Sequence, residues 1–250
     1  MKPAFVNAIP AAHELLPLTR HENASQPRGM GHWTRLPVHA PGMRIGLFGG
    51  TFNPPHQGHR LASLMAMARL GLDRVWWMVT PGNPLKDNLA LPPLPDRMAA
   101  AVRIASHPRI DITGFEAEIG TRFSHDTISF LQRRCPGVQL VWIMGADNLA
   151  SLHRWQRWRD IVRMVPIAII DRPGSTLRAV HGRAGASLAG HRLDESDGKL
   201  LAQSHPPAYI FLHGRRSSQS STALRLAAQK SAAPDQGILT GHPENQLKFL

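Results

Sequence analysis

Two histidines, His56 and His59, stand three positions apart at the end of a glycine-rich segment that reads GGTFNPPHQGH over residues 49–59. Residues at this spacing share one face of a helix, so both imidazoles can face the same pocket. Glycines let backbone N–H groups approach an anion without interference from a Cβ atom, and a helix N-terminus adds partial positive charge. These residue types therefore favour phosphate binding, with two imidazoles built into the site.

The elements around this segment supply the setting that a phosphate site needs. Residues 43–48 are an apolar run typical of a buried strand. Beyond the histidines, Leu61, Leu64, Met65 and Ala68 follow the i, i+3, i+4, i+7 spacing of one helical face. A glycine-rich turn between a strand and a helix is a common phosphate site. Without this context the segment would be only a turn that contains two histidines.

A second candidate phosphate site occurs near the end of the chain, where residues 219–225 read QSSTALR. Ser220 or Ser221 would cap a helix, and the N–H groups behind the cap would bind an anion. Arg225 lies one turn further on, where its guanidinium can reach the same phosphate with two hydrogen bonds. Taken alone, this string would be read more readily as an ordinary capped helix with a surface arginine.

Apolar runs alternate with helical patterns through the middle of the chain. Strands are predicted at residues 43–48, 75–79, 110–113, 139–144, 166–170 and 208–212. Helices are predicted at residues 59–70, 94–106, 126–134, 158–164 and 221–229. This order predicts an α/β fold, with a doubly wound, mostly parallel sheet and helices on both faces. Ligands bind at the carboxyl ends of the strands in such sheets, and both candidate motifs follow a strand.

Composition along the chain suggests three parts. We expect residues 1–41 to be an N-terminal extension, partly or wholly disordered, because prolines, glycines and isolated charges show no sustained period. The domain itself is predicted over residues 42–231, and residues 232–250 form a C-terminal tail. Within the domain, residues 172–207 contain glycine, serine and charges with little periodicity, which predicts a long surface insertion or a mobile flap.

The overall composition limits the class of protein. A chain of 250 residues with 42% hydrophobic residues can bury a sizeable core. Its one cysteine, Cys135, excludes an intramolecular disulfide and a cysteine-rich zinc cluster, and this usage is typical of a reducing cytoplasm. No apolar stretch approaches the ~20 residues of a membrane span, and the first residues form no signal core. We therefore expect a cytoplasmic protein with no membrane partner.

The net charge of +12 and the pI of about 11.3 raise nucleic-acid binding as a competing class. The basic residues are spread over many segments, without a dense run of lysine and arginine. A small polyanionic substrate would benefit from the same positive field, so charge alone does not decide between them. Because dense basic runs are missing, we predict no nucleic-acid partner.

Together, the two phosphate motifs resemble the signatures of the HxGH nucleotidyltransferases, with the HxGH motif at residues 56–59. Residues 219–225 resemble the ISSTxxR pattern of that superfamily, with Gln219 in place of isoleucine. The resemblance implies a Rossmann-like fold and transfer of a nucleotidyl group. It implies that ATP is held by Gly49, Gly50, Thr51, Phe52, His56, His59, Ser220, Ser221, Thr222 and Arg225. Of these, the resemblance assigns the catalytic roles to His56, His59 and Arg225.

Four segments between the motifs resemble those of the bacterial nicotinate-nucleotide adenylyltransferases. They read VTPGNPLK over residues 79–86, FSHDT over 123–127, MGADN over 144–148 and LHRWQRW over 152–158. The resemblance implies that nicotinate mononucleotide is the second substrate. The residues implied to bind it are Lys86, Ser124, Asp147, Trp155 and Arg172.

The resemblance gives these residues separate roles. Lys86 would meet phosphate, Asp147 would accept a hydrogen bond from a ribose hydroxyl, and Trp155 would stack on the pyridine ring. Ser124 occupies a position that touches the pyridine carboxylate, but the sequence has FSHDT where the pattern is YTxDT. From spacing alone Trp155 would instead be a core residue, and Arg172 is nearly as readily a solvated surface arginine.

The resemblance also implies a reaction, in which ATP and nicotinate mononucleotide give nicotinate adenine dinucleotide and pyrophosphate. We expect Mg²⁺ to arrive with ATP, because no cluster of carboxylates lies near the motifs to form a protein metal site. Phosphopantetheine adenylyltransferase is the nearest alternative, since it shares the HxGH loop, but it fits the segment around Trp155 poorly. The preference for acid over amide and the formation of an oligomer stay open.

Overall fold

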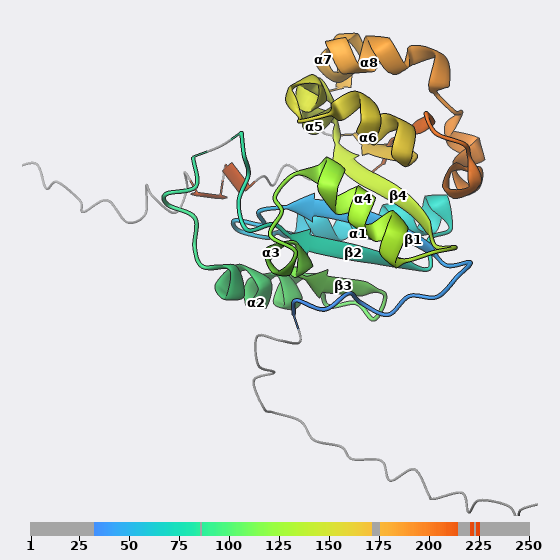
Figure 1. Ribbon diagram of the computed structural model, residues 1–250. Helices are drawn as coiled ribbons and strands as arrows, with labels where there is room; N and C mark the ends of the chain where they lie inside the picture. Colours follow the sequence, from blue (N-terminus) through green and yellow to red (C-terminus); the bar gives the residue numbers. More distant parts are fainter. Residues whose placement is uncertain (1–32, 86, 172–175, 215–220, 223, 226–250) are drawn as a thin grey trace, which may run out of the picture.

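The computed structural model describes residues 33–85, 87–171, 176–214, 221–222 and 224–225 (Figure 1). Within these residues, six strands form one parallel sheet in the order β3-β2-β1-β4-β5-β6. The strands are β1 (Arg44–Gly50), β2 (Arg74–Val79), β3 (Ile110–Thr113), β4 (Gln139–Gly145), β5 (Ile167–Ile170) and β6 (Tyr209–Leu212). The predicted α/β fold with a parallel sheet is confirmed.

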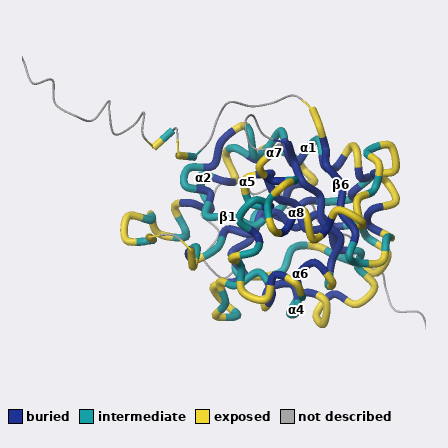
Figure 2. The backbone as a smooth tube through the Cα atoms, turned by 90° about the horizontal axis from the view of Figure 1, so that it is seen from above, coloured by how far each residue is buried: buried dark blue, intermediate teal, exposed yellow. Residues whose placement is uncertain are grey.

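The strands are apolar on both faces because helices cover both sides of the sheet. In β2, five residues in succession, from Val75 to Val79, are buried. Trp77 faces the cluster that packs under α1 (Gln57–Leu70) and α2 (Leu94–Ala105). Trp76 faces the opposite cluster. Figure 2 shows that the buried residues form the interior of the molecule, with exposed residues at the periphery.

Between β3 and β5, four helices contribute side chains to the cluster on the second face of the sheet, which includes Trp76. They are α3 (Phe115–Glu118), α4 (Ser124–Arg134), α5 (Ala146–Ser151) and α6 (Trp158–Met164), with the short 3₁₀ helix η2 (Leu152–Arg154) before α6. The predicted α4 and α6 are confirmed, whereas α3 and α5 were not predicted. Both are less than two turns long, which is too short for a helical period to show in the sequence.

Strand β1 lies between β2 on one side and β4 on the other. The chain runs from β1 to β2 and β3 along one half of the sheet, and then crosses to β4, β5 and β6 in the other half. Such a reversal of strand order opens a crevice at the carboxyl ends of the two central strands. The glycine-rich segment leaves β1 at this point.

The sequence analysis placed residues 33–41 in the N-terminal extension, and the structure shows that this segment packs against the domain. The backbone oxygen of Trp33 accepts a hydrogen bond from the N–H of Gly114 at 2.8 Å, and the oxygen of Arg35 accepts one from the Thr113 hydroxyl at 3.0 Å. The side chains of Trp33 and Leu36 pack against the two apolar clusters. An irregular segment held by backbone hydrogen bonds leaves no periodic pattern in a sequence.

Residues 172–207 were predicted to be a long surface insertion or a mobile flap. In the described part of this stretch the chain is mostly helical, with α7 (Thr176–His181), α8 (Arg183–Leu188), η3 (Ala189–His191) and η4 (Glu195–Gln203). Ala179, Ala184 and Leu201 are completely buried. The segment therefore packs on the domain, and its apolar contacts come mainly from small residues that a hydrophobic pattern registers weakly.

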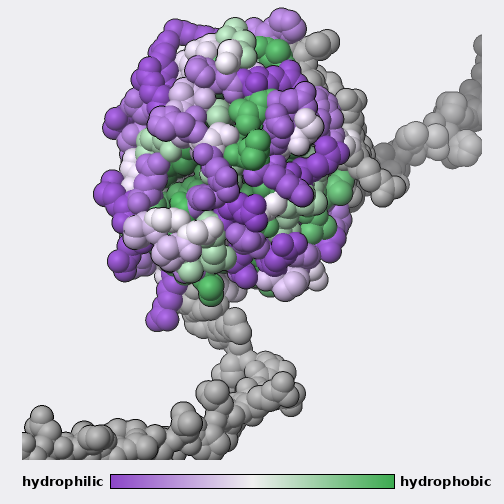
Figure 3. Space-filling view, turned by 90° about the vertical axis from the view of Figure 1, so that its right-hand side faces the viewer, coloured by the Kyte–Doolittle hydropathy of each residue, from purple (hydrophilic) through white to green (hydrophobic). Residues whose placement is uncertain are grey.

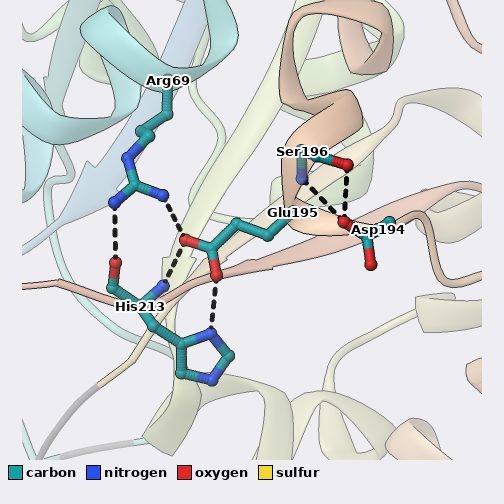
Figure 4. Close-up of polar contacts among 5 residues, drawn as sticks. All are labelled: Arg69, Asp194, Glu195, Ser196 and His213. Carbon is teal, nitrogen blue, oxygen red and sulfur yellow. Dashed lines mark hydrogen bonds and ion pairs between the residues drawn. The ribbon is translucent and has the colours of Figure 1, made fainter.

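The carboxylate of Glu195, at the start of η4, joins this helix to the end of α1 and to the residue that follows β6 (Figure 4). It accepts a hydrogen bond from Arg69 at the end of α1 at 2.6 Å. It also accepts hydrogen bonds from the backbone N–H and the Nδ1 of His213, each at 2.9 Å. Because His213 directly follows β6, this contact fixes the position at which the chain leaves the sheet toward the second phosphate motif.

The surface is mainly polar on the face shown in Figure 3, where hydrophobic side chains form separate patches among hydrophilic ones. None of the helices in the described part of the chain combines the length and apolar composition that a membrane span requires.

Candidate active site

A cavity of about 770 Å³ opens at the carboxyl ends of the central strands. Its volume lies within the usual range for small-molecule sites, roughly 300–1,000 Å³. The walls come from the end of β1, the loop after it, the loop after β2, and the first turns of α4 and α5. Residues of the second phosphate motif complete the wall. The cavity thus lies at the edge of the sheet where the sequence analysis predicted a ligand site.

The two histidines lie together in this cavity. His56 precedes α1 and is 3% exposed, and its ring centroid lies 3.8 Å from that of His59 in the first turn of the helix. The backbone N–H of His56 donates to Nδ1 of His59 at 3.1 Å. An accepting Nδ1 carries no proton, so the proton of a neutral His59 ring is on Nε2. His59 is therefore in the tautomer that can donate a hydrogen bond through Nε2.

Aromatic side chains fix the orientation of the His59 ring. Its centroid lies 4.9 Å from that of Phe52 and 5.9 Å from those of Phe48 and Trp77. Phe52 in turn stacks on Trp77, with centroids 4.9 Å apart and ring planes within 16°. This packing holds the imidazole in place before any ligand binds, as electrostatic catalysis requires.

The second phosphate motif closes against the first. The hydroxyl of Ser221 donates to the backbone oxygen of Pro54 at 2.9 Å, and Arg225 donates through Nη1 to the backbone oxygen of Asn53. Arg225 also contacts Thr222 Oγ1 at 3.3 Å. All three residues of the motif line the cavity. The two segments that were predicted to bind phosphate therefore share one cleft.

The other half of the cavity is built around two tryptophans. Trp155 lies edge-on to Trp142 of β4, with centroids 6.3 Å apart and ring planes at 83°. A Cβ atom on Gly49 would lie 3.4 Å from Cη2 of Trp142, so the glycine leaves the indole edge uncovered. Ser124 and Asp147 line the same cavity. This half offers a flat apolar surface with polar groups beside it, which suits an aromatic ring that carries a polar substituent.

The cavity thus brings together most of the residues that the sequence analysis singled out. Those lining it are Gly49, Gly50, Thr51, Phe52, His56, His59, Ser124, Asp147, Trp155, Ser221, Thr222 and Arg225. Three further candidates lie outside the described residues: Lys86, Arg172 and Ser220.

A buried carboxyl group in the cavity wall was missed. Glu116 is 5% exposed, and the hydroxyl of Thr127 donates to its Oε1 at 2.6 Å. Burial raises the pKa of the Glu116 carboxyl above its usual range, and hydrogen bonds with Thr127 and Thr80 oppose that rise. Its place just after β3, at the same edge of the sheet as the other motifs, was a signal that could have identified it.

Exposed arginines contribute to the cavity wall. Arg122, Arg154 and Arg225 line the cavity and are exposed. Their guanidinium groups add positive charge to the cavity, which favours anionic ligands.

The cytidylyltransferase-like family model matches residues 47–227. A protein of Brucella abortus (strain 2308), named probable nicotinate-nucleotide adenylyltransferase, is 53% identical over 190 residues, which cover 76% of this chain and 98% of that protein. One of the same name from Bradyrhizobium sp. (strain ORS 278) is 55% identical over 183 residues, covering 73% of this chain and 95% of its own.

Among solved structures, the Plasmodium falciparum nicotinic acid mononucleotide adenylyltransferase complexed with NaAD is similar, with a TM-score of 0.54. The match covers 74% of this chain and 83% of that one, at 16% sequence identity. At this identity the likeness concerns the fold alone.

Proposed function

The chain belongs to the nicotinate-nucleotide adenylyltransferases of the cytidylyltransferase-like family, and we propose that its cavity transfers the adenylyl group of ATP to nicotinate mononucleotide. This reaction is a step of NAD biosynthesis. The observation that carries the proposal is the meeting of two phosphate-binding motifs beside a tryptophan-lined compartment in one cavity. Such a cavity can hold a triphosphate and an aromatic acceptor side by side.

In the proposed reaction, an oxygen of the 5′-phosphate of nicotinate mononucleotide attacks the α-phosphorus of ATP. A new P–O bond forms, the bond from the α-phosphorus to the oxygen that bridges to the β-phosphorus breaks, and pyrophosphate leaves with that electron pair. The attacking oxygen is already anionic at neutral pH, so no general base is needed. Catalysis then depends on in-line positioning and on stabilising the charge around the phosphorus.

The residues of the first half of the cavity suit the triphosphate. His56 and His59 would donate hydrogen bonds to the α- and β-phosphates, and the backbone of residues 50–52 would bind phosphate oxygens. Arg225 and Ser221 would hold the triphosphate from the other side, with Ser220 and Thr222. This arrangement surrounds the reacting phosphorus with donors that are fixed before the substrate binds.

The second half suits the mononucleotide. Trp155 would stack on the electron-poor pyridine ring, and Ser124 would contact the pyridine carboxylate. Asp147 would accept a hydrogen bond from a ribose hydroxyl. Lys86 and Arg172, which lie outside the described residues, would contact phosphate and nucleotide.

Magnesium is proposed to enter as part of the substrate, bound to the phosphates of ATP. Mg²⁺ commonly binds through one or two carboxylates and substrate phosphates, without a protein cage. The described residues contain no group of three His, Cys, Asp or Glu side chains close enough to hold a metal ion. The metal would neutralise part of the triphosphate charge, while the side chains above position it.

The test is to measure pyrophosphate release from ATP with each of three acceptors: nicotinate mononucleotide, nicotinamide mononucleotide and phosphopantetheine. We expect turnover with nicotinate mononucleotide and none with phosphopantetheine. Turnover with phosphopantetheine alone would contradict the proposal. A parallel binding assay with a single-stranded oligonucleotide at low salt tests the alternative class, which requires strongly salt-dependent binding without pyrophosphate release.

A further inference from the structure

Arg97 lies beneath the loop that follows β1, and neither the motifs nor the cavity lining includes it. It is in the first turn of α2 and is 4% exposed. Its Nη1 donates to the backbone oxygens of Thr51 and Thr80, each at 2.8 Å, and its Nε donates to that of Pro92 at 2.8 Å. The backbone oxygen of Pro81 lies 3.5 Å from Nη2 of Arg97. One guanidinium therefore connects the loop after β1, the loop after β2 and the start of α2.

This buried cation has no anionic partner in the part of the chain that the structure describes, where the ion pairs of arginine involve other residues. Burial lowers the pKa of Arg97 from its usual value, because the charged form loses hydration. Burying an unpaired charge is costly, and the backbone oxygens compensate only part of that cost. A polyanionic ligand in the adjacent cavity would supply the missing negative charge.

The hydrogen bond to Thr51 also fixes the direction of a neighbouring N–H group. In a trans peptide the C=O and the following N–H point in opposite directions. Because the oxygen of Thr51 points toward Arg97, the N–H of Phe52 points away from it. Thr51 and Phe52 both line the cavity, whereas Arg97 does not. The hydrogen bond from Arg97 therefore turns the Phe52 N–H toward the side on which the cavity lies.

The backbone at Phe52 needs such support. Its φ of +46° lies in the left-handed region, which a bulky residue seldom adopts. Conformations of this kind persist only where surrounding contacts enforce them, and they cluster at ligand sites. Two contacts do so here: the ring of Phe52 stacks on Trp77, and the peptide before it is bonded to Arg97.

We propose that Arg97 is a positioning residue that holds the Thr51–Phe52 peptide so that the Phe52 N–H binds a phosphate of the triphosphate, with a buried positive charge beneath it. Arg97 acts through the loop and does not touch the substrate. The inference rests on the proposed function for the identity of ATP. Its test uses the binding of a triphosphate, which needs no acceptor substrate.

The test compares Arg97→Lys, which keeps the charge but not the fork of donors, with Arg97→Met. The matched control is Arg103→Met, because Arg103 is an exposed arginine on the same helix. Binding of inorganic tripolyphosphate and of ATP is measured by calorimetry, and circular dichroism checks the fold. We expect both Arg97 variants to bind each anion about tenfold more weakly than the control, the scale of losing a hydrogen bond to a charged group. The KM for ATP should rise in parallel, while the KM for the mononucleotide changes less than about twofold.

A second measurement uses the unaltered chain, so it does not depend on the folding of a variant. In nuclear magnetic resonance spectra, tripolyphosphate should shift the backbone N–H signal of Phe52 more than that of Val79, a buried strand residue outside the cavity lining. An unmoved Phe52 signal at saturating tripolyphosphate would overturn the inference. So would Arg97 variants that fold and bind as the control does, or that raise both KM values equally. A chain that binds tripolyphosphate through Phe52 yet does not adenylate the mononucleotide would contradict the proposed function and leave the role of Arg97 intact.

Discussion

Ser221 donates its hydroxyl proton to the backbone oxygen of Pro54 at 2.9 Å, although 167 positions separate the two residues along the chain. The contact joins the loop after the first strand to the second phosphate motif, which comes after the last strand in the chain. Each of these segments was predicted to bind phosphate, and their contact places both of them on one cavity. The cavity therefore depends on the completion of the whole sheet.

Removing the Ser221 hydroxyl should weaken the binding of the triphosphate without unfolding the domain. A hydrogen bond of this kind contributes about 1 kcal/mol, so Ser221→Ala should raise the KM for ATP about fivefold. Ser204→Ala is the matched control, since that hydroxyl also donates to a backbone oxygen, at 3.0 Å, but lies outside the cavity lining. Steady-state kinetics with ATP as the varied substrate is the measurement. Equal KM values for the two variants would show that the contact does not matter for ATP.

Replacing His59 should impair the chemical step. His59→Ala removes a fixed donor and should lower kcat by about 10²–10³, the range for losing one preorganised hydrogen bond to a developing charge. The measurement is pyrophosphate release at saturating substrates. His191→Ala serves as control, because His191 is exposed and outside the cavity lining. If a folded His59→Ala variant stays within about threefold of the parent kcat, below the loss expected for such a donor, His59 has no part in the mechanism.

Shortening Trp155 should affect one substrate more than the other. Trp155→Ala removes the proposed stacking surface and should raise the KM for nicotinate mononucleotide more than that for ATP. Trp155→Phe keeps an aromatic face and should bring the KM for nicotinate mononucleotide most of the way back to the parent value. Both KM values are measured for each variant. An increase confined to ATP would refute the stacking assignment.

Glu116 should make the stability of the domain depend on pH. Below pH 4.5, the ordinary pKa of a glutamate, the carboxyl is protonated in both the folded and the unfolded chain. As the pH rises, the unfolded chain loses this proton first, because burial raises the pKa in the folded chain, and the folded state is destabilised. Glu116→Gln has no such proton to lose. Its free energy of unfolding relative to the parent should therefore increase from pH 4.5 upward, until the folded pKa is passed.

Urea unfolding at a series of pH values measures this effect. Glu118→Gln is the matched control, since Glu118 lies on the same short helix and is exposed. Each variant is compared with the parent at every pH. A difference for Glu116→Gln that stays flat with pH would mean that the carboxyl ionises in the folded chain as readily as in the unfolded one.

Features encoded in neighbouring residues were predictable from the sequence. The run of buried residues in β2 identifies a strand covered on both faces, and the HxGH spacing places His56 and His59 together at the start of α1, with His56 just before the helix and His59 in its first turn. The strand order could not be read from the pattern itself, but the alternation of strands and helices restricted it to a parallel sheet.

Features that depend on distant contacts were not predictable. Arg97 is one of many arginines in the sequence, and only the fold brings it to Thr51, 46 positions earlier. Trp33 lies in a stretch that shows no helical or strand periodicity. Backbone hydrogen bonding next to the end of β3 holds it in place, and such bonding leaves no pattern in the sequence. The buried alanines of α7 and α8 carry too little hydrophobicity to mark a helix, yet their small size allows the close packing of these helices.

The hydrogen bonds of Glu195 connect the helical segment after β5 to the end of α1 and to His213, the residue that follows β6. A loosened η4 would release His213, and with it the start of the connection that carries the chain to Ser221. Substitutions or insertions in a remote part of the surface would then alter nucleotide affinity, although none of the changed atoms borders the ligand. Variation in this segment is thus a route by which related chains could tune substrate affinity while their cavity residues stay the same.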